Sequence, residues 1–505
     1  MKVTTRLLTA FLFAAPLAGA QETAAPQASA CEVDQGNPQF VARSWLALSK
    51  GIAAVNQDAD PSNDLREALR VLTDPRARDR DRNVVGQQYT AGQAYILLLS
   101  AGTPAIVQRG EIGIQTDPEA TIDLVLAADS VFTAVLAAHP ECARTITEWR
   151  QHKPWLDLVN EAINALNSEQ VDSAEVLANR ALVLDKTAPY AYTVLAMVAR
   201  TRNQHDEALR LYREAIERAG TETLYADVRV KTLGDIARML TDRAVDAPAA
   251  QRAALAREAI TAYETYLTEQ EIDDLSRGFG MSQLANLYSL AGDSAKVRTV
   301  YASVVADPSK YGERTLLEAG VIATRAEAMA DAAKLFSAVH TSNPYQRDAL
   351  NNLAAAYIGT EEYDKVFPLV ERLIAIDPNN PDNYMLYAYA YSGKLKAARG
   401  AVQKAYTDSL VKYNSMAEQM PVKVTINEFT RLQQETRVGG SIENKGRAPK
   451  SYTMEVELLD RSGQVIGTQQ ANIGPVGAGE RTTFRVSFPV GGENIAGYRY
   501  KPLST

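Results

Sequence analysis

The sequence predicts an all-α helical-repeat solenoid followed by a small all-β sandwich. Small and aromatic residues recur every 34 positions through the middle of the chain, and hydrophobic residues alternate with polar ones after about Met420. The 505 residues are 46% hydrophobic and 23% charged, which fits a folded protein and excludes wholesale disorder or a multi-span membrane protein. The formal net charge of −8 argues against a nucleic-acid-binding surface.

The first twenty residues have the pattern of a signal peptide. Lys2 and Arg6 precede an apolar run, and small residues end it at Ala20, so we expect cleavage between Ala20 and Gln21. No later segment reaches about 18 uninterrupted apolar residues, so no transmembrane segment is expected in the mature chain. The sequence therefore predicts export to the periplasm or medium of a bacterium, with residues 1–20 removed and residues 21–37 forming a flexible N-terminal segment.

The chain contains two cysteines, Cys31 and Cys142. An exported chain meets oxidising conditions, which favours a disulfide between them. Two alternatives remain open. Cys31 follows Ala28-Ser29-Ala30, a weak likeness to a lipid-attachment signal that lacks leucine at the −3 position, and both cysteines could also be free thiols.

Alanines mark the clearest repeat. Ala174 and Ala208 are 34 residues apart, and so are Ala181 and Ala215. Small residues at these positions let neighbouring helices approach closely, and a single helix pair cannot bury its apolar face alone, so copies stack. We expect a solenoid over residues 151–415 and divergent helices of the same kind over residues 38–150.

This pattern resembles the tetratricopeptide repeat (TPR), in which leucine, a small residue and tyrosine precede alanine, an aromatic residue, alanine and proline. In the upstream copy we expect a loop near Gly102 to Pro118, and in a later copy an insertion around Ala244 to Arg252. The positions that carry the resemblance are Tyr192, Leu195, Ala196, Ala208, Tyr212, Ala215, Leu284, Ala285, Tyr288, Gly292, Tyr301, Gly320, Ala332, Phe336, Pro344, Leu353, Ala354, Tyr357, Pro378, Tyr384, Ala388 and Tyr391, with Gly92, Tyr95, Ala128, Phe132, Pro140, Leu233, Gly234, Ala237 and Tyr263 in the divergent copies.

Residues 421–505 contain six or seven short runs with period-two alternation, separated by turn residues. Such runs favour an antiparallel sandwich. The segment also resembles the FxLYD family of bacterial immunoglobulin-like domains, since Val456-Glu457-Leu458-Leu459-Asp460 occupies the place of the family motif, with Val for Phe and Leu for Tyr. The resemblance implies an extracytoplasmic accessory or adhesion-like module with no known chemistry.

The sequence offers no recognisable catalytic or cofactor-binding motif. The phosphate-binding loop, the dinucleotide fingerprint, the nucleophile elbow and the zinc-protease helix are all missing. His139, His152, His205 and His340 are scattered, and none lies four residues from another. Acidic pairs such as Asp273-Asp274 lie at predicted helix ends, where they favour capping. We therefore expect neither a cofactor nor a metal, and no enzymatic activity.

We interpret the chain as an exported scaffold that binds protein or peptide partners on the concave surface of its solenoid. The alternatives are a structural envelope component held through its C-terminal β-domain and a hydrolase with an unfamiliar site. The residues expected on the concave surface, from the register of the first helix of each pair, are Tyr190, Thr193, Met197, Arg200, Phe279, Asn286, Arg314, Asn351 and Met385.

Overall fold

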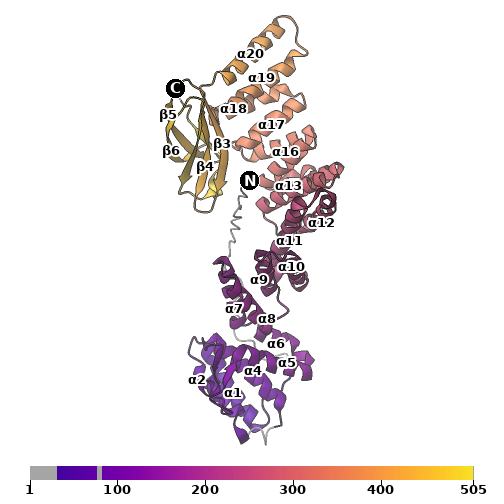
Figure 1. Cartoon of the computed structure of the whole chain (residues 1–505), viewed down its shortest axis with the longest axis vertical. Coiled ribbons are helices and arrows are strands. Elements are labelled where there is room, and N and C mark those ends of the chain that lie inside the picture. The colour runs from indigo at the N-terminus through magenta and orange to yellow at the C-terminus, as the bar shows by residue number, and fades with distance from the viewer. Residues whose placement is uncertain (1–30, 77–81, 504–505) are drawn as a thin grey trace. The chain divides into compact units, whose positions relative to one another are not determined.

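The computed structural model describes residues 31–76 and 82–503. In these ranges the chain is mostly helical as far as Glu418 and forms β-strands from Val422 onwards (Figure 1). It divides into two compact units, a first unit ending at Ile236 and a second unit beginning at Ala237. The expected signal cleavage site at Ala20 and Gln21 lies outside the described residues. None of the helices in these ranges combines the length and apolar character needed to cross a bilayer.

The first unit consists mainly of helix pairs in which α4 packs on α5, α7 on α8 and α9 on α10. Its helices are α1 (Gln39–Val55), α2 (Ser62–Leu72), α4 (Val84–Ser100), α5 (Leu124–Ala138), α6 (Ala143–Arg150), α7 (Lys153–Asn167), α8 (Val171–Leu184), α9 (Tyr190–Thr201), α10 (His205–Ala219) and α11 (Ala226–Asp246), the last of which continues into the second unit.

The second unit continues the same arrangement, with α13 packed on α14, α15 on α16, α17 on α18 and α19 on α20. Around Ala244 to Arg252, where the sequence predicts an insertion, the long helices α11 and α12 are separated by only two residues. The further helices are α12 (Ala249–Thr268), α13 (Asp274–Leu290), α14 (Val297–Ala306), α15 (Glu313–Arg325), α16 (Met329–Ser342), α17 (Arg347–Gly359), α18 (Val366–Ile376), α19 (Pro381–Leu395) and α20 (Gly400–Glu418).

Small residues set the packing within the pairs, as the 34-residue spacing predicts. A Cβ added to Gly92 would lie 2.6 Å from the ring of Phe132, and one added to Gly320 would lie 2.5 Å from the ring of Phe336. Real Cβ atoms do not approach so closely, so both positions require glycine. The same ring-on-glycine contact therefore closes α4 on α5 in the first unit and α15 on α16 in the second.

The turn within each pair contains one residue in the left-handed region of backbone conformation. Glycine adopts it easily, and Gly292 does so with a φ of 82°. Elsewhere a residue with a side chain takes the same position: Glu169 (φ 60°), Asn203 (60°), Glu327 (56°) and Glu361 (62°). These pairs therefore close with some backbone strain.

A disulfide ties the N-terminal segment of the first unit to its core. Cys31 and Cys142 are bonded, with their Cα atoms 4.6 Å apart, and Cys142 is fully buried. Gln35 Nε2 also donates to Thr90 Oγ1 at 3.0 Å. The sequence predicts a flexible segment over residues 21–37, but residues 31–37, which are the described part of it, are held by the disulfide to Cys142 after α5 and by the Gln35 hydrogen bond to α4.

The loop expected near Gly102 to Pro118 carries a short hairpin. Strand β1 (Ile106–Gln108) pairs antiparallel with β2 (Thr121–Asp123), and between them lies a 3-10 turn (Arg109–Ile112). Asp123 accepts hydrogen bonds from the backbone N–H groups of Val125 and Leu126 and so caps α5. The hairpin therefore leads directly into the second helix of the pair.

The C-terminal strands form two antiparallel three-stranded sheets that share one apolar core, which confirms the predicted sandwich. One sheet has the order β3-β4-β7 and the other the order β6-β5-β8. This β-sandwich lies beside α16 to α18, within the second unit (Figure 1). Its strands are β3 (Val422–Arg431), β4 (Thr436–Asn444), β5 (Lys450–Leu459), β6 (Val465–Val476), β7 (Arg481–Phe488) and β8 (Gly497–Tyr500).

Candidate interaction surface

The nine residues expected on the concave surface all belong to first helices of the pairs, and the structure distributes them over both units. Within each unit, we call the surface made by these helices the first-helix face. Tyr190, Thr193, Met197 and Arg200 lie on α9 in the first unit, and the second unit contains Phe279 and Asn286 on α13, Arg314 on α15, Asn351 on α17 and Met385 on α19.

On α9 the expected residues are mostly engaged within the protein. Met197 is only 9% exposed. Thr193 Oγ1 donates to the carbonyl oxygen of Tyr190 at 2.7 Å, and Arg200 forms an ion pair with Asp235 at 3.6 Å. Met197 therefore offers almost no surface to a partner, contrary to the sequence-based expectation. Register alone does not show how closely the neighbouring helices cover a side chain.

Tyr190 is the middle member of an aromatic row that the sequence analysis missed. Its ring makes edge-to-face contacts with Trp155 at a centroid distance of 6.1 Å and with Tyr225 at 5.8 Å. Burial, with the nearby Asp227 and Tyr225, raises the pKa of Tyr190 to about 12, so its hydroxyl stays protonated. The three aromatic residues follow one another at intervals of 35 positions, the signal that could have revealed them.

Phe279 is the most exposed aromatic residue of α13, with 46% of its surface accessible. It stands between two glycines. A Cβ on Gly278 would lie 3.2 Å from side-chain atoms of Arg314, and one on Gly280 would lie 3.1 Å from the ring of Tyr266. Because these glycines let α13 pack closely against its neighbours, the Phe279 side chain remains on the open side of the helix.

Polar ties join α13 to α15 across the first-helix face. Glu318 accepts a hydrogen bond from Ser282 Oγ at 2.5 Å and pairs with Arg314 at 2.5 Å. Asp274, the first residue of α13, accepts from the backbone N–H groups of Arg314 at 2.8 Å and Thr315 at 3.1 Å, and so caps the start of α15. Arg314 is therefore engaged with Glu318, while the two helices are fixed relative to each other.

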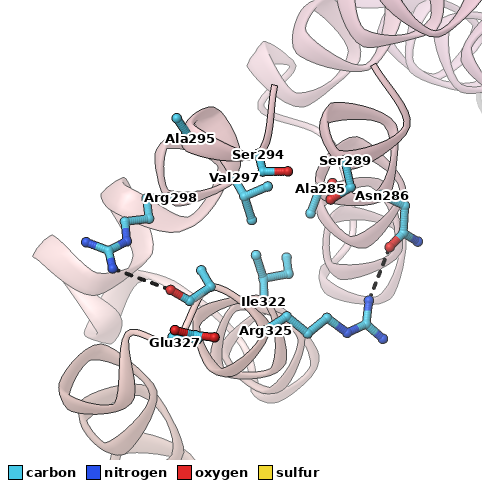
Figure 2. A pocket seen from close by; sticks show the side chains of 11 residues that line it. Ala285, Asn286, Ser289, Ser294, Ala295, Val297, Arg298, Ile322, Arg325 and Glu327 are labelled. Carbon is cyan, nitrogen blue, oxygen red and sulfur yellow. Dashed lines mark hydrogen bonds between the residues drawn. The ribbon is translucent and has the colours of Figure 1, made fainter. Parts of the chain in front are cut away.

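A pocket of about 400 Å³ opens at the other end of α13 and α15, where they meet the start of α14. Figure 2 shows Val297 and Ile322 facing each other in its middle, with Arg298 and Arg325 on opposite sides. Ala285, Val297 and Ile322 are buried and form an apolar floor. The lining consists of Ala285, Asn286, Ser289, Ser294, Ala295, Val297, Arg298, Ile322, Arg325, Ala326 and Glu327.

The pocket carries two arginines that have no carboxylate partner among the described residues. Arg325 Nη1 donates to Asn286 Oδ1 at 3.1 Å, and Arg298 Nη2 donates to the carbonyl oxygen of Ala326 at 3.4 Å (Figure 2). Both guanidinium groups are exposed, as is the carboxylate of Glu327. Two positive charges therefore face one negative charge around an apolar floor, which favours an anionic ligand with a short apolar group.

One residue of this pocket, Asn286, was predicted from the sequence. Arg325, at the end of the same face, was not predicted, and neither was Arg298, because Arg298 belongs to a second helix. Asn351 and Met385 do not line the pocket and are half-buried on α17 and α19. Tyr389, one turn beyond Met385, is 54% exposed and offers more surface than the predicted residue. The repeat register therefore predicted which helices form the face, but not which of their side chains are exposed.

Solved structures that resemble the chain include TPR proteins. PilF of Pseudomonas aeruginosa is 14% identical, with 46% of this chain and 96% of PilF covered at a TM-score of 0.29. A tetratricopeptide repeat protein from Parabacteroides merdae is 15% identical, with coverages of 53% and 93% and a TM-score of 0.28. Yeast Tom70 is 13% identical, with coverages of 78% and 66% and a TM-score of 0.27. The likeness extends to the helical-repeat arrangement and no further. No protein-family model and no curated protein matches the chain.

Proposed function

We propose that this chain is an exported, non-enzymatic scaffold of the TPR type that binds an acidic segment of a partner protein on the first-helix face of its second unit. The observation that carries the proposal is the pocket between α13, α14 and α15, in which Arg298 and Arg325 have no carboxylate partner among the described residues. Phe279 and Asn286 are exposed on the same helix, α13, and extend the surface available to an extended peptide.

The chemistry of the pocket defines the segment that fits. A carboxylate forms charge-assisted hydrogen bonds with a guanidinium group, and Arg298 and Arg325 stand on opposite sides of the apolar floor (Figure 2). A segment that places a short aliphatic side chain on Val297 and Ile322, with an acidic residue on each side of it, would contact the apolar floor and both arginines. Because the arginines are exposed, their attraction for the segment should weaken as salt is added.

Binding can be tested with a fluorescein-labelled decapeptide of alternating glutamate and valine, against the same peptide with lysine in place of glutamate. The variant Arg298→Glu/Arg325→Glu should bind the acidic peptide at least about tenfold more weakly, because like charges at an interface cost several kcal/mol. Arg257→Glu, at an exposed position on α12, is the matched control. Equal affinity in the double variant and the unaltered protein would reject the pocket as the binding site.

Export is supported by the charged, apolar and small-residue order of residues 1–20. Expression of the full chain in a bacterium should yield a periplasmic or secreted product whose N-terminus is Gln21. A chain lacking residues 1–20 should stay in the cytoplasm. Recovery of the full chain from the cytoplasm with Met1 still present would contradict the proposal.

The proposal includes an FxLYD-like assignment for the β-sandwich. In its support, Val456 and Leu458 are fully buried on β5, while Asp460 accepts hydrogen bonds from Ser462 N–H at 2.8 Å and Gln464 N–H at 2.9 Å. The motif thus combines two core positions with an aspartate that closes the turn to β6. Replacement of Asp460 by alanine should destabilise that turn by about 1 kcal/mol, as measured by denaturant unfolding.

A further inference from the structure

The β-sandwich contacts the helical part of the second unit at three consecutive turns between helix pairs, the turns that precede α15, α17 and α19. We call these the inter-pair turns. All three lie at starts of first helices, the helices that make up the first-helix face. The contacts between the inter-pair turns and the sandwich consist largely of hydrogen bonds with buried partners.

The centre of the contact is Asp377, in the turn before α19, whose side chain is completely buried. Tyr500 Oη on β8 donates to Asp377 Oδ1 at 2.6 Å, and Arg347 Nε on α17 donates to Oδ2 at 3.2 Å. Burial, followed by the nearby Asp377 carboxylate, raises the pKa of Tyr500 well above its ordinary value, so the phenol remains a donor. One carboxylate thus joins the β-sandwich to α17 and to the turn between α18 and α19.

A second tie holds the start of α15. Glu313, its first residue, accepts from Arg431 Nη2 of β3 and from Asn343 Nδ2, both at 2.8 Å. Asn343 Nδ2, which is buried in the turn before α17, also donates to the carbonyl oxygen of Ala496, beside β8, at 2.9 Å. The sandwich therefore links the turn before α15 to the turn before α17.

A third tie joins Asn379, in the turn before α19, to backbone N–H groups of the sandwich. The sandwich and the turns also approach each other closely. Asn379 Oδ1 accepts from Leu503 N–H at 2.8 Å, and its carbonyl oxygen accepts from Val424 N–H at 2.9 Å. A Cβ added to Gly497 would lie only 2.3 Å from the carbonyl oxygen of Tyr345. Rotation of one helix pair against the next would break several of these contacts at once.

We infer that the β-sandwich acts as a brace that fixes the spacing of α15, α17 and α19 and thereby holds the pocket on α13–α15 in its binding geometry, with Arg431 and Tyr500 as positioning residues. This inference rests on the proposed function. The brace holds Glu313 at the start of α15, and the end of the same helix supplies Ile322 and Arg325 to the pocket. Arg431 and Tyr500 do not line the pocket: Arg431 acts through Glu313 on α15, and Tyr500 acts through Asp377 in the turn before α19.

The test compares Arg431→Ala and Arg431→Ala/Tyr500→Phe with Tyr452→Phe, a buried tyrosine within the core of the sandwich. Hydrogen exchange in the first turns of α15 and α17 should become about tenfold faster in the brace variants and stay unchanged in Tyr452→Phe. Affinity for the glutamate–valine peptide should fall about three- to tenfold in the brace variants, although every pocket residue is intact.

The outcomes separate the brace from the proposed function. If the folded brace variants, Arg431→Ala alone included, show unchanged exchange and unchanged peptide affinity, the brace is rejected. If Arg298→Glu/Arg325→Glu binds the peptide as well as the unaltered protein, the proposed function fails, while the exchange rates still decide whether the brace exists. Faster exchange without a loss of affinity would show that the sandwich stabilises the turns but does not position the pocket, and would overturn the inference.

Discussion

Asp185 and Asp377 occupy the same position in two repeats, one in each unit, and their carboxylates are used differently. Each aspartate directly follows the last residue of the second helix of a pair, α8 or α18, and each is buried. Asp185 is satisfied nearby, by Gln151 Nε2 at 2.8 Å and by the N–H and hydroxyl of Thr187. Asp377 binds Tyr500, which lies 123 positions further along the chain.

The difference shows how a repeat position can serve two purposes. A buried carboxylate must be hydrogen-bonded, but the repeat pattern does not determine which residues donate to it. In the first unit the donors are local, so the turn is complete within the solenoid. In the second unit one of the donors is Tyr500 of the β-sandwich, so the turn also attaches the sandwich to the solenoid.

Removal of the two carboxylates should give the largest contrast. Asp377→Ala leaves the Arg347 guanidinium and the Tyr500 hydroxyl poorly paired, and we expect the free energy of unfolding of the second unit to fall by about 3–5 kcal/mol. Asp185→Ala leaves only uncharged donors and should lower that of the first unit by about 1–3 kcal/mol. Denaturant unfolding monitored by hydrogen exchange distinguishes the units. Equal losses in both variants would show that the distant partners add nothing.

The disulfide is a stabilising feature of the first unit, and its loss should be the next largest effect. Cys31→Ser/Cys142→Ser should lower the free energy of unfolding of the first unit by about 2–4 kcal/mol, because the bond restricts the unfolded chain. The second unit should be unaffected. Titration of the denatured, unreduced protein should detect no free thiol, and two titratable thiols would contradict the bond.

The ring-on-glycine contacts offer a comparison in which both units should respond alike. Gly92→Ala and Gly320→Ala each push a Cβ to within 2.6 Å or less of a buried phenylalanine ring. Overpacking of this kind should cost about 1–3 kcal/mol in each unit, measured by thermal or denaturant unfolding. A large difference between the two variants would show that one pair can move apart and the other cannot.

The smallest expected effect is a gain in stability. Glu169 in the first unit and Glu361 in the second are exposed and have positive φ angles of 60° and 62°. Replacement of either by glycine should remove the backbone strain and raise the free energy of unfolding by about 0.5–1 kcal/mol. Matched Glu→Ala variants should not gain. If alanine stabilises as much as glycine, side-chain repulsion rather than strain is the cause.

The architecture could be predicted from the sequence because the residues that pack neighbouring helices together recur at a fixed spacing. The spacing of Ala174, Ala181, Ala208 and Ala215 predicted four positions that are all fully buried. The Cys31–Cys142 bond was also favoured, because an exported chain with two cysteines meets oxidising conditions. The candidate site was harder. Arg298 lies on a second helix, whereas the predicted residues were taken from first helices only. Met197 is buried by neighbouring helices, and the spacing of residues in the sequence does not show such burial.

The docking of the β-sandwich could not be predicted for a physical reason. Alternation in β8 shows which side chains enter a core, but Tyr500 directs its hydroxyl to a carboxylate on another fold. Asn343, Asn379 and Asp377 looked like ordinary turn residues in the sequence. Only the three-dimensional arrangement shows that their polar groups bind a second domain, because the partners are separated by more than a hundred residues.

The position of Tyr500 on β8 also affects the order in which the chain assembles. A chain is synthesised from its N-terminus, and contacts between distant segments wait for the later segment. The donors to Asp185, Gln151 and Thr187, have both emerged before α9 begins, whereas the contacts of Asp377 are completed only after β8 has emerged. The bond between Asp377 and Tyr500 is therefore completed late in synthesis, and we expect the inter-pair turns before α15, α17 and α19 to become fixed only then.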